Sequence, residues 1–480
     1  MNKDRITRIV ITFVIVGVLA VLWGKQSDLA YNVAQQRAIL LGRYTLETMI
    51  TLLTVTPILL CVLYGLWKKQ TPQTPAEKRQ GTFKLIALIV SILLAVVFVD
   101  VAMRLVRQQA VYVGDEQSYH RTPNQVHTGV FRDRPEFAFS YPNATPGYPD
   151  VAYTLTVDER GFRNPMRHEQ YDWIVLGDSF AEGSSVTDED VWTVRLAERR
   201  GVRIYNLGMS GGSPVTYLDT LQKFGVEMKP KVALYMLYEG NDLRDSNFRA
   251  LRMEGKKKTS LSDRIFKASP LRHLIKASLV RTLGPVGRKR FSDAPAVHDP
   301  SHLMYPVAWL PIEIPAGGGY SYAFDVKRLE QHYITEEAFR ATIAYAESLR
   351  LLEEAKQVCD AHGIALIFIY APDAPSVLIE DILDRVPAEQ LHAFMATRLK
   401  RLPDPETLVE ELREGTQVRE RIFRQFCAEK GIPFLSLTEP LRQKTQEGVR
   451  TYYTYDQHWT PDGHAAIAEY LSEHIPPTAE

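Results

Sequence analysis

The sequence predicts an α/β domain built on a mainly parallel sheet and preceded by three apolar segments. From about residue 170 onward, short apolar runs of the kind found in buried parallel strands alternate with helix-like stretches. The first three of these runs lead directly into turns rich in glycine, aspartate and asparagine. Such an alternation produces a parallel sheet covered on both faces, with ligand chemistry at the carboxyl ends of the strands.

The expected strands and helices define a domain over residues 151–478. Strands are expected at residues 173–176, 202–207, 232–238, 364–370 and 433–437. Helices are expected at residues 188–200, from about 215, at 336–362 and from Pro461, because proline suits the first turn of a helix. The alternation of strands and helices stops at an insertion that spans about residues 244–335. Residues 108–150, rich in proline, tyrosine and charge, are expected to form an irregular connector.

Composition sets broad limits on the class of protein. The chain has 480 residues, enough for one large domain or two ordinary ones. It contains 57 lysine and arginine residues and 57 aspartate and glutamate residues. This balance gives no indication of nucleic acid or of a strongly acidic partner.

Three apolar runs near the N-terminus, at residues 9–23, 49–67 and 85–106, predict a membrane anchor. The second and third approach the ~20 residues that a helix needs to cross a bilayer. The first could be the apolar core of a signal peptide, but no clear cleavage site follows it and two further runs come after it. We therefore expect residues 1–107 to form three transmembrane helices of a multi-pass protein in the cell (inner or plasma) membrane.

Basic residues predict the orientation of this anchor. Lysine and arginine are more frequent at the N-terminus and in the 68–84 loop than between the first two runs. Segments of this kind stay in the cytoplasm. Three crossings then leave everything after residue 107 outside the cytoplasm.

The insertion and the cysteines leave alternatives open. Residues 256–281 mix basic and apolar residues, as in a basic amphipathic helix. Such a helix either packs on its own domain or lies on an anionic membrane surface. Cys61 lies in the second apolar run, whereas Cys359 and Cys427 lie far apart in helix-like segments and form either a disulfide or two buried thiols.

Ser179 is the candidate nucleophile, in a Gly-Asp-Ser-Phe sequence directly after the first strand. Serine needs a base to take its proton and hydrogen-bond donors for the developing oxyanion. Gly208 ends the second strand and Asn241 the third, so a backbone N–H and a side-chain amide are available at neighbouring strand ends. Taken singly, each of these residues is more typical of an ordinary turn.

His458 is the candidate base, because it precedes the last helix and follows Asp456 by two residues. A nearby carboxylate can orient an imidazole for proton transfer. Together with Asp462 and His464, the same residues also resemble a set of zinc ligands. Because His464 falls inside the expected helix and no matching cluster precedes it, we expect no metal and no other cofactor.

Four sequence blocks, in this order, resemble those of the SGNH (GDSL-type) hydrolase superfamily, which is named for a Ser, a Gly, an Asn and a His. They lie at 177–180, 206–211, 240–242 and 456–458. A Gly-Phe-Arg sequence at 161–163 also resembles one often seen before the serine block in membrane-anchored members. The resemblance covers roughly residues 155–475 and implies a flavodoxin-like three-layer α/β/α fold.

The resemblance also implies roles for these residues. Ser179 would form an acyl-serine intermediate, His458 would act as base and then acid, and Asp456 would orient it. The N–H groups of Ser179 and Gly208, with the amide of Asn241, would form the oxyanion hole.

One departure from the family pattern concerns the carboxylate. Many members space the last pair as Asp-x-x-His, whereas this chain has Asp-x-His followed by Trp. The shorter form is similar to the branch that contains the alginate O-acetyltransferases. It leaves Asp462 as a second candidate for the orienting carboxylate.

The predicted function is to remove or add acetyl groups on a cell-envelope polysaccharide or lipid-linked glycan. Water would resolve the acyl-enzyme in an esterase, and a sugar hydroxyl in an O-acyltransferase. A transferase would need an acyl donor from a separate membrane protein, because nothing in the chain resembles a many-span exporter. The alternative is a non-catalytic glycan-binding or scaffold membrane protein on the same fold.

Overall fold

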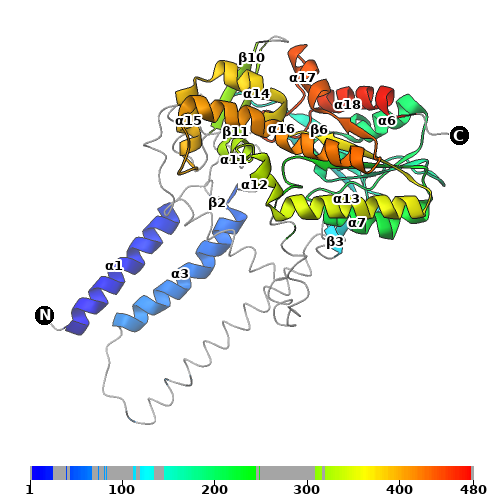
Figure 1. The fold of residues 1–480 in the computed structure, drawn as a ribbon. Helices are drawn as coiled ribbons and strands as arrows, with labels where there is room; N and C mark the ends of the chain where they lie inside the picture. Colours follow the sequence, from blue (N-terminus) through cyan, green and yellow to red (C-terminus); the bar gives the residue numbers. More distant parts are fainter. Residues whose placement is uncertain are drawn as a thin grey trace. The chain divides into compact units, whose positions relative to one another are not determined.

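The computed structural model describes residues 3–24, 39–40, 44–67, 74, 81, 83, 112–114, 119–133, 145–244, 248, 309–315 and 319–476. The chain separates into two compact units, and the second contains the α/β domain (Figure 1). The first unit comprises residues 1–108, 136–140 and 258–289; the second comprises 109–135, 141–257 and 290–480.

A parallel five-stranded sheet forms the centre of the second unit, in the order β13-β12-β9-β7-β8. Its strands are β7 (Trp173–Leu176), β8 (Ile204–Asn206), β9 (Val232–Tyr238), β12 (Ala365–Ala371) and β13 (Phe434–Ser436). The predicted α/β class is confirmed, and each expected strand lies within two residues of an observed one. The chain runs from β7 outward to β8 and then returns to the other side of β7, so the order reverses between β7 and β9. Ligand sites of open parallel sheets lie at this kind of switch point.

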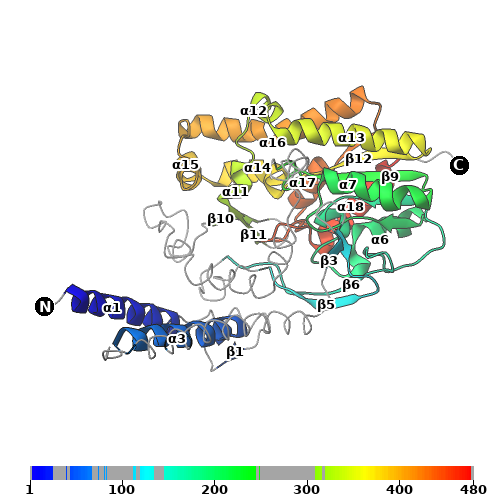
Figure 2. The same ribbon diagram turned by 90° about the horizontal axis from the view of Figure 1, so that it is seen from below.

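Alternate side chains of the strands enter two separate apolar cores, because successive residues of a strand point to opposite faces. Trp173 and Val175 belong to one core, together with residues of α6 (Trp192–Arg200) and α18 (Pro461–His474). Ile174 and Leu176 belong to the other, with residues of α7 (Pro214–Thr220), α13 (Ile343–Ala361) and α16 (Pro405–Glu429). Figure 2 shows α13 and α16 on one side of β9 and β12, and α6 and α18 on the other. The result is a three-layer α/β/α arrangement.

The described part of the second unit contains further helical elements. They are α5 (Ser179–Glu182), η2 (Asp188–Asp190), η3 (Leu221–Gly225), η4 (Val226–Met228), α11 (Val326–Glu330), α12 (Glu336–Arg340), α14 (Ala374–Arg385), α15 (Ala388–Ala396) and α17 (Thr438–Gln446).

The single helix expected at 336–362 is wrong, because the chain forms two helices there, α12 and α13. The break falls at Thr342, which has an extended backbone and caps α13 by accepting a hydrogen bond from the Tyr345 N–H. A threonine side chain that satisfies a free helical N–H stabilises a new helix start, typically by about 1 kcal/mol.

The irregular connector expected at 108–150 is also wrong in part, because this stretch contains three strands. They are β3 (Tyr112–Gly114), β4 (Tyr119–Arg121) and β5 (Val126–Phe131), and β5 pairs in antiparallel fashion with β6 (Val151–Thr156). The residues of β5 alternate between exposed and partly buried, the pattern of a strand with one face in solvent.

The described end of the insertion is part of the domain core. Strands β10 (Trp309–Ile314) and β11 (Tyr320–Asp325) form a hairpin, and Leu310, Tyr322 and Phe324 are fully buried in the first apolar core. The basic segment at 256–281 lies outside the described residues, so its amphipathic helix stays a prediction.

The first unit contains α1 (Lys3–Gly24) and α3 (Leu46–Trp67), with the two-residue strands β1 (Ile39–Leu40) and β2 (Tyr44–Thr45). The helices are joined by hydrogen bonds from the Trp23 indole to Thr56 (2.9 Å) and from the Trp67 indole to Thr12 (2.8 Å). Within the residues that the structure describes, no helix combines the length and the apolar character needed to cross a membrane. The third apolar run, 85–106, lies outside those residues, and the three-helix anchor stays a prediction.

The cysteines are free thiols. Cys359 and Cys427 are buried in the second apolar core, and Cys61 is exposed. Burial raises the pKa of Cys359 and of Cys427 to about 12, which keeps both thiols protonated and poorly nucleophilic.

Candidate active site

Ser179 stands at the carboxyl end of β7 as the first residue of the short helix α5. The Asp178 carboxylate caps this helix by accepting the Phe180 N–H at 2.9 Å. A Cβ on Gly177 would lie 2.5 Å from the Ala181 Cβ, so only glycine lets the strand turn this sharply into the helix. The turn places the serine at the switch point between β7 and β9.

His458 meets Ser179 from the far end of the sequence. Its Nε2 lies 2.8 Å from the Ser179 Oγ, and its Nδ1 hydrogen-bonds with Asp456 Oδ1. With Nδ1 protonated and facing the carboxylate, Nε2 carries a lone pair toward the serine hydroxyl. The structure thus brings Ser179, His458 and Asp456 into the geometry of a nucleophile, a base and an orienting carboxylate.

The short Asp-x-His spacing is accommodated by an unusual backbone at Gln457. Its φ is +64°, in the left-handed region that few non-glycine residues occupy. This turn also brings Asp456 Oδ1 within 3.3 Å of the His458 backbone N–H. The Gln457 side chain is buried and donates to the Ala323 carbonyl at 3.0 Å, which ties the turn to β11.

The electrostatics of the pair favour a charged His458. Burial lowers the pKa of His458, but the charge and hydrogen bond of Asp456 outweigh burial and raise it above its ordinary value. Burial likewise raises the pKa of Asp456, but the facing His458 lowers it below its ordinary value overall. The carboxylate therefore stabilises the imidazolium that forms when the histidine takes a proton.

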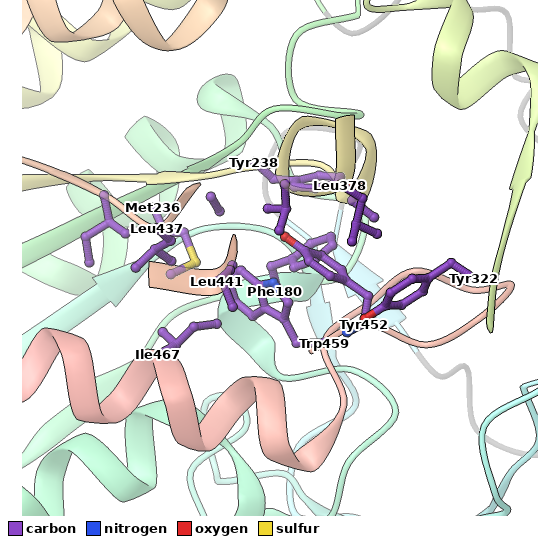
Figure 3. Close-up of a cluster of buried hydrophobic side chains, with 14 of the residues drawn as sticks. Phe180, Met236, Tyr238, Tyr322, Leu378, Leu437, Leu441, Tyr452, Trp459 and Ile467 are labelled. Atoms are coloured by element: carbon purple, nitrogen blue, oxygen red, sulfur yellow. Dashed lines mark hydrogen bonds between the residues drawn. The ribbon is translucent and has the colours of Figure 1, made fainter. Parts of the chain in front are cut away.

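Phe180, the residue after the serine, packs against the histidine ring. The two rings stack at 4.7 Å, and Phe180 also stacks on Tyr238 at 3.9 Å and meets the edge of Trp459 at 4.7 Å. Figure 3 shows Phe180, Trp459 and Tyr452 gathered in this buried cluster. Phe180, itself held by Tyr238 and Trp459, therefore covers one face of the imidazole.

Arg328 of α11 supports the same loop from the insertion. Its Nη2 donates to the Asp456 carbonyl at 3.3 Å, and its Nη1 donates to the Asp373 carboxylate at 3.0 Å. Burial alone would raise the pKa of Asp373, but the Arg328 charge lowers it overall. The cation is thus held between a buried carboxylate and the loop that carries the base.

The three predicted oxyanion donors lie near Ser179, but two of them have intramolecular acceptors. The Gly208 N–H donates to Asn206 Oδ1 at 2.8 Å. The Asn241 amide donates to Asp178 Oδ2 at 3.2 Å and to Asp242 Oδ1 at 3.1 Å. The Ser179 N–H donates to no group that the structure describes. Asn241 and Gly208 would have to exchange these acceptors to bind an oxyanion.

Gly208 has a further reason to be glycine. A Cβ at this position would lie 2.5 Å from the Glu182 nitrogen and 2.7 Å from the Ala181 Cβ. The loop after β8 therefore packs directly on the backbone of α5.

The Gly-Phe-Arg sequence at 161–163 supports the loop that follows α5. The Arg163 guanidinium is buried and donates to the carbonyls of Gly183, Thr154 (2.9 Å) and Val186 (2.8 Å), and to the Asp188 carboxylate (2.8 Å). None of these contacts reaches Ser179, so Arg163 fixes the surroundings of the nucleophile helix and not the reacting atoms.

The alternative zinc set is not assembled. His464 is buried in α18, its Nδ1 accepts the Trp192 N–H at 3.3 Å, and Asp462 is exposed on the same helix. Burial holds the pKa of His464 well below its ordinary value. Across the described ranges, no three His, Cys, Asp or Glu side chains are placed to hold a metal ion together. Because the carboxylate at His458 Nδ1 belongs to Asp456, the geometry favours Asp456 over Asp462 as the orienting group.

Comparison with known proteins agrees with the site. Residues 393–480, which contain Asp456 and His458, match the family described as "SGNH hydrolase-like domain, acetyltransferase AlgX". Residues 393–480 are thus similar to an SGNH hydrolase-like domain, and Ser179, His458 and Asp456 are arranged as the nucleophile, base and orienting carboxylate of an ester hydrolase or acyltransferase would be. No curated protein matches the chain at a significant level.

Three solved structures are similar to this chain at low sequence identity. A member of the lipolytic protein G-D-S-L family from Veillonella parvula is 12% identical, with 63% of this chain and 97% of that chain covered and a TM-score of 0.29. A lipase/acylhydrolase from Enterococcus faecalis is 12% identical, with coverages of 64% and 98% and a TM-score of 0.26. A GDSL-like lipase from Bacteroides thetaiotaomicron is 10% identical, with coverages of 63% and 86% and a TM-score of 0.26.

Proposed function

We propose that this chain transfers acyl groups from esters through an acyl-serine on Ser179, and that its substrates are acetylated or acetylatable glycans of the cell envelope. The observation that carries the proposal is the 2.8 Å contact between Ser179 Oγ and His458 Nε2, with Asp456 at the other ring nitrogen. A hydroxyl in this setting can lose its proton as it attacks an ester carbonyl.

In the first half of the reaction, the Ser179 Oγ attacks the acyl carbonyl carbon while its proton moves to His458 Nε2. The carbonyl oxygen becomes an oxyanion that the Ser179 N–H, and the Asn241 amide once it leaves Asp178, would stabilise. His458 then gives the proton to the departing alcohol oxygen as the ester bond breaks. The acyl group remains on Ser179.

In the second half, a hydroxyl compound takes the place of the alcohol. His458 removes the proton of the acceptor hydroxyl, and the acceptor oxygen attacks the acyl carbon. The bond between the acyl carbon and the Ser179 Oγ then breaks as His458 returns the proton to the serine. Water as the acceptor releases a free acid, and a sugar hydroxyl yields a new ester. The same residues serve both outcomes, so the acceptor decides between esterase and transferase.

We further propose that the domain works outside the cytoplasm, anchored by the apolar N-terminal segments. The arrangement of basic residues around those segments supports this orientation. The Asp-x-His-Trp sequence, similar to the alginate O-acetyltransferase branch, supports a glycan as the substrate. A transferase reaction there would use an acyl donor supplied by a separate membrane protein.

The test is an acetyl-transfer assay on the full chain in detergent, with p-nitrophenyl acetate as donor and with or without a mannuronate oligosaccharide as acceptor. Free acetate alone marks an esterase, and acetylated oligosaccharide marks a transferase. Replacing Ser179 with alanine should reduce both products to the uncatalysed level. Undiminished product from S179A would remove Ser179 from the mechanism, and an inactive wild type would favour a non-catalytic glycan-binding or scaffold protein.

A further inference from the structure

Residues 119–133 lie outside the five-stranded sheet. They nevertheless contact both the helix that begins at Ser179 and the loop that carries Asp456 and His458. Strand β4 ends at Arg121, and Asp133 follows β5 by two residues. The two side chains are buried, with 9% and 1% of their residue surface exposed. Neither residue belongs to the four sequence blocks that carry the family resemblance.

Asp133 holds the loop that bears the base. Its Oδ1 accepts the backbone N–H groups of Tyr455 (3.0 Å) and Asp456 (3.1 Å), and its Oδ2 accepts those of Thr454 (2.5 Å) and Tyr148 (2.9 Å). Three of these four donors are consecutive residues that end at Asp456. Hydrogen bonds to an ionised acceptor are roughly twice as strong as neutral ones, so this carboxylate fixes the loop backbone directly before His458.

Arg121 holds the helix that bears the nucleophile. Its Nε and Nη2 donate to the two oxygens of Glu182 at 2.5 and 2.9 Å. Glu182 is fully buried in α5, three residues after Ser179, and it also accepts a hydrogen bond from Ser210 in the loop after Gly208. The paired, planar geometry gives this contact a defined orientation as well as attraction.

We propose that the segment 119–133 is a clamp that sets the distance between Ser179 and His458. The inference rests on the proposed function and names two positioning residues, Asp133 for the base loop and Arg121 for the nucleophile helix. Ser179 and His458 are 279 residues apart in sequence, and the sheet determines only the Ser179 side of their contact directly. Catalytic groups need to be held within about 0.5 Å of their productive geometry. One short segment, bonded both to the loop of Asp456 and to the helix α5, supplies that constraint.

The principal test is D133N in the full chain. Asparagine has the same shape, but its NH₂ group faces backbone N–H donors and cannot accept from them. With the base loop shifted, kcat for p-nitrophenyl acetate should fall roughly 10- to 100-fold, while KM changes less than about threefold. The acidic limb of kcat/KM should also move to lower pH, because Asp456 no longer holds the imidazolium as well. Among the described residues, the titratable groups that interact electrostatically with His458 include Asp456, Asp178, Arg328 and His464.

A matched control lies beside the antiparallel pair of β5 and β6. Arg132 and Asp150 form an ion pair at 3.3 Å between partly exposed side chains. D150N, which changes this ion pair outside the segment 119–133, should retain wild-type kcat and an unshifted acidic limb. R121K keeps the positive charge but loses the paired hydrogen bonds to Glu182, so it should lower kcat as D133N does. If D133N does not fold, R121K tests the clamp in its place.

A second readout separates the clamp from the proposed function. In the wild type, the proton between His458 Nδ1 and Asp456 should give a strongly downfield NMR signal, and D133N should weaken or shift it even if no ester is turned over. An unchanged signal in D133N, or a kcat loss that only follows the loss of folded protein, would overturn the clamp. An inactive wild type with the expected change in signal would overturn the proposed function alone.

Discussion

Replacing Asp456 with asparagine provides the sharpest test of the candidate site. The carboxylate accepts the His458 Nδ1–H and lies 3.3 Å from the His458 backbone N–H. Asparagine keeps the size of the side chain but can present its NH₂ to the ring, which favours the tautomer with the proton on Nε2. That tautomer has no lone pair for the Ser179 hydroxyl.

The expected loss follows from the exposure of the pair. Removing the carboxylate of a buried serine triad in this way costs about 10⁴-fold in kcat. Here 23% of the His458 side-chain surface and 35% of the Asp456 side-chain surface are exposed to solvent, so water can partly replace the lost interaction. We therefore expect kcat to fall about 10³-fold, which is about 4 kcal/mol of transition-state stabilisation.

The pH profile gives an independent measure. The acidic limb of kcat/KM reports the pKa of the base in the free enzyme, and the base must be neutral to act. Asp456 raises the pKa of His458, so its removal should lower that pKa and shift the acidic limb to lower pH. Hydrolysis of p-nitrophenyl acetate across the pH range, with enzyme concentration corrected for folded protein, measures both effects.

Asp462 supplies the matched control, because it is an exposed carboxylate four residues after His458 on α18. D462N should leave kcat and the acidic limb unchanged. If D462N reduces kcat as much as D456N does, the orienting role assigned to Asp456 from the geometry is wrong.

Two further predictions concern packing and stability. In G208A, the added Cβ would lie 2.5 Å from the Glu182 nitrogen and 2.7 Å from the Ala181 Cβ. The free energy of unfolding, measured in urea, should therefore fall by about 1–3 kcal/mol, and ester turnover should fall with it. An unchanged unfolding midpoint would show that the loop after β8 moves to accept the methyl group without cost. Burial, and to a lesser extent Arg163, His458 and Arg195, lower the pKa of His464 in the folded chain. As the pH falls below about 6.5, His464 therefore gains a proton in the unfolded chain but not in the folded one. The free energy of unfolding should then fall by up to about 1.4 kcal/mol per pH unit. H464N should flatten this dependence while the exposed H474N does not, and equal slopes for H464N and the wild type would contradict the assignment.

Much of the fold was predictable, because buried parallel strands carry a local signal. The runs at 173–176 and 232–238 are continuous apolar stretches, and the structure has strands with these same bounds. Helix interruptions were harder to predict. Residues 336–362 read as one helix, since neither proline nor glycine marks the break that the Thr342 cap creates.

The residues of the candidate site were predictable for a similar reason. In a parallel sheet, the residues that follow neighbouring strands meet at one edge, so Ser179, Gly208 and Asn241 could be placed together from strand ends alone. The sequence could not reveal that two of the expected oxyanion donors, the Gly208 N–H and the Asn241 amide, already donate to acceptors within the protein. The contacts of Asn206 with the Gly208 N–H and of Asp178 with the Asn241 amide depend on side-chain geometry at the strand ends.

The contacts of Asp133 lay beyond prediction because they combine three difficulties. The carboxylate binds backbone N–H groups, which every residue type presents, so its partners leave no mark on the sequence. Those partners in the base loop are 321 to 323 residues away. Finally, the surrounding proline- and tyrosine-rich composition indicates a connector, where an aspartate is expected to be solvated. The structure supplies what the sequence lacks, because the residues of β5 alternate between exposed and partly buried and so give the segment a packed face. A strand with one packed face must cover something, and here it leads to a residue that bonds to the loop of Asp456 and His458. The proposed dependence of kcat on Asp133 therefore follows from this packing.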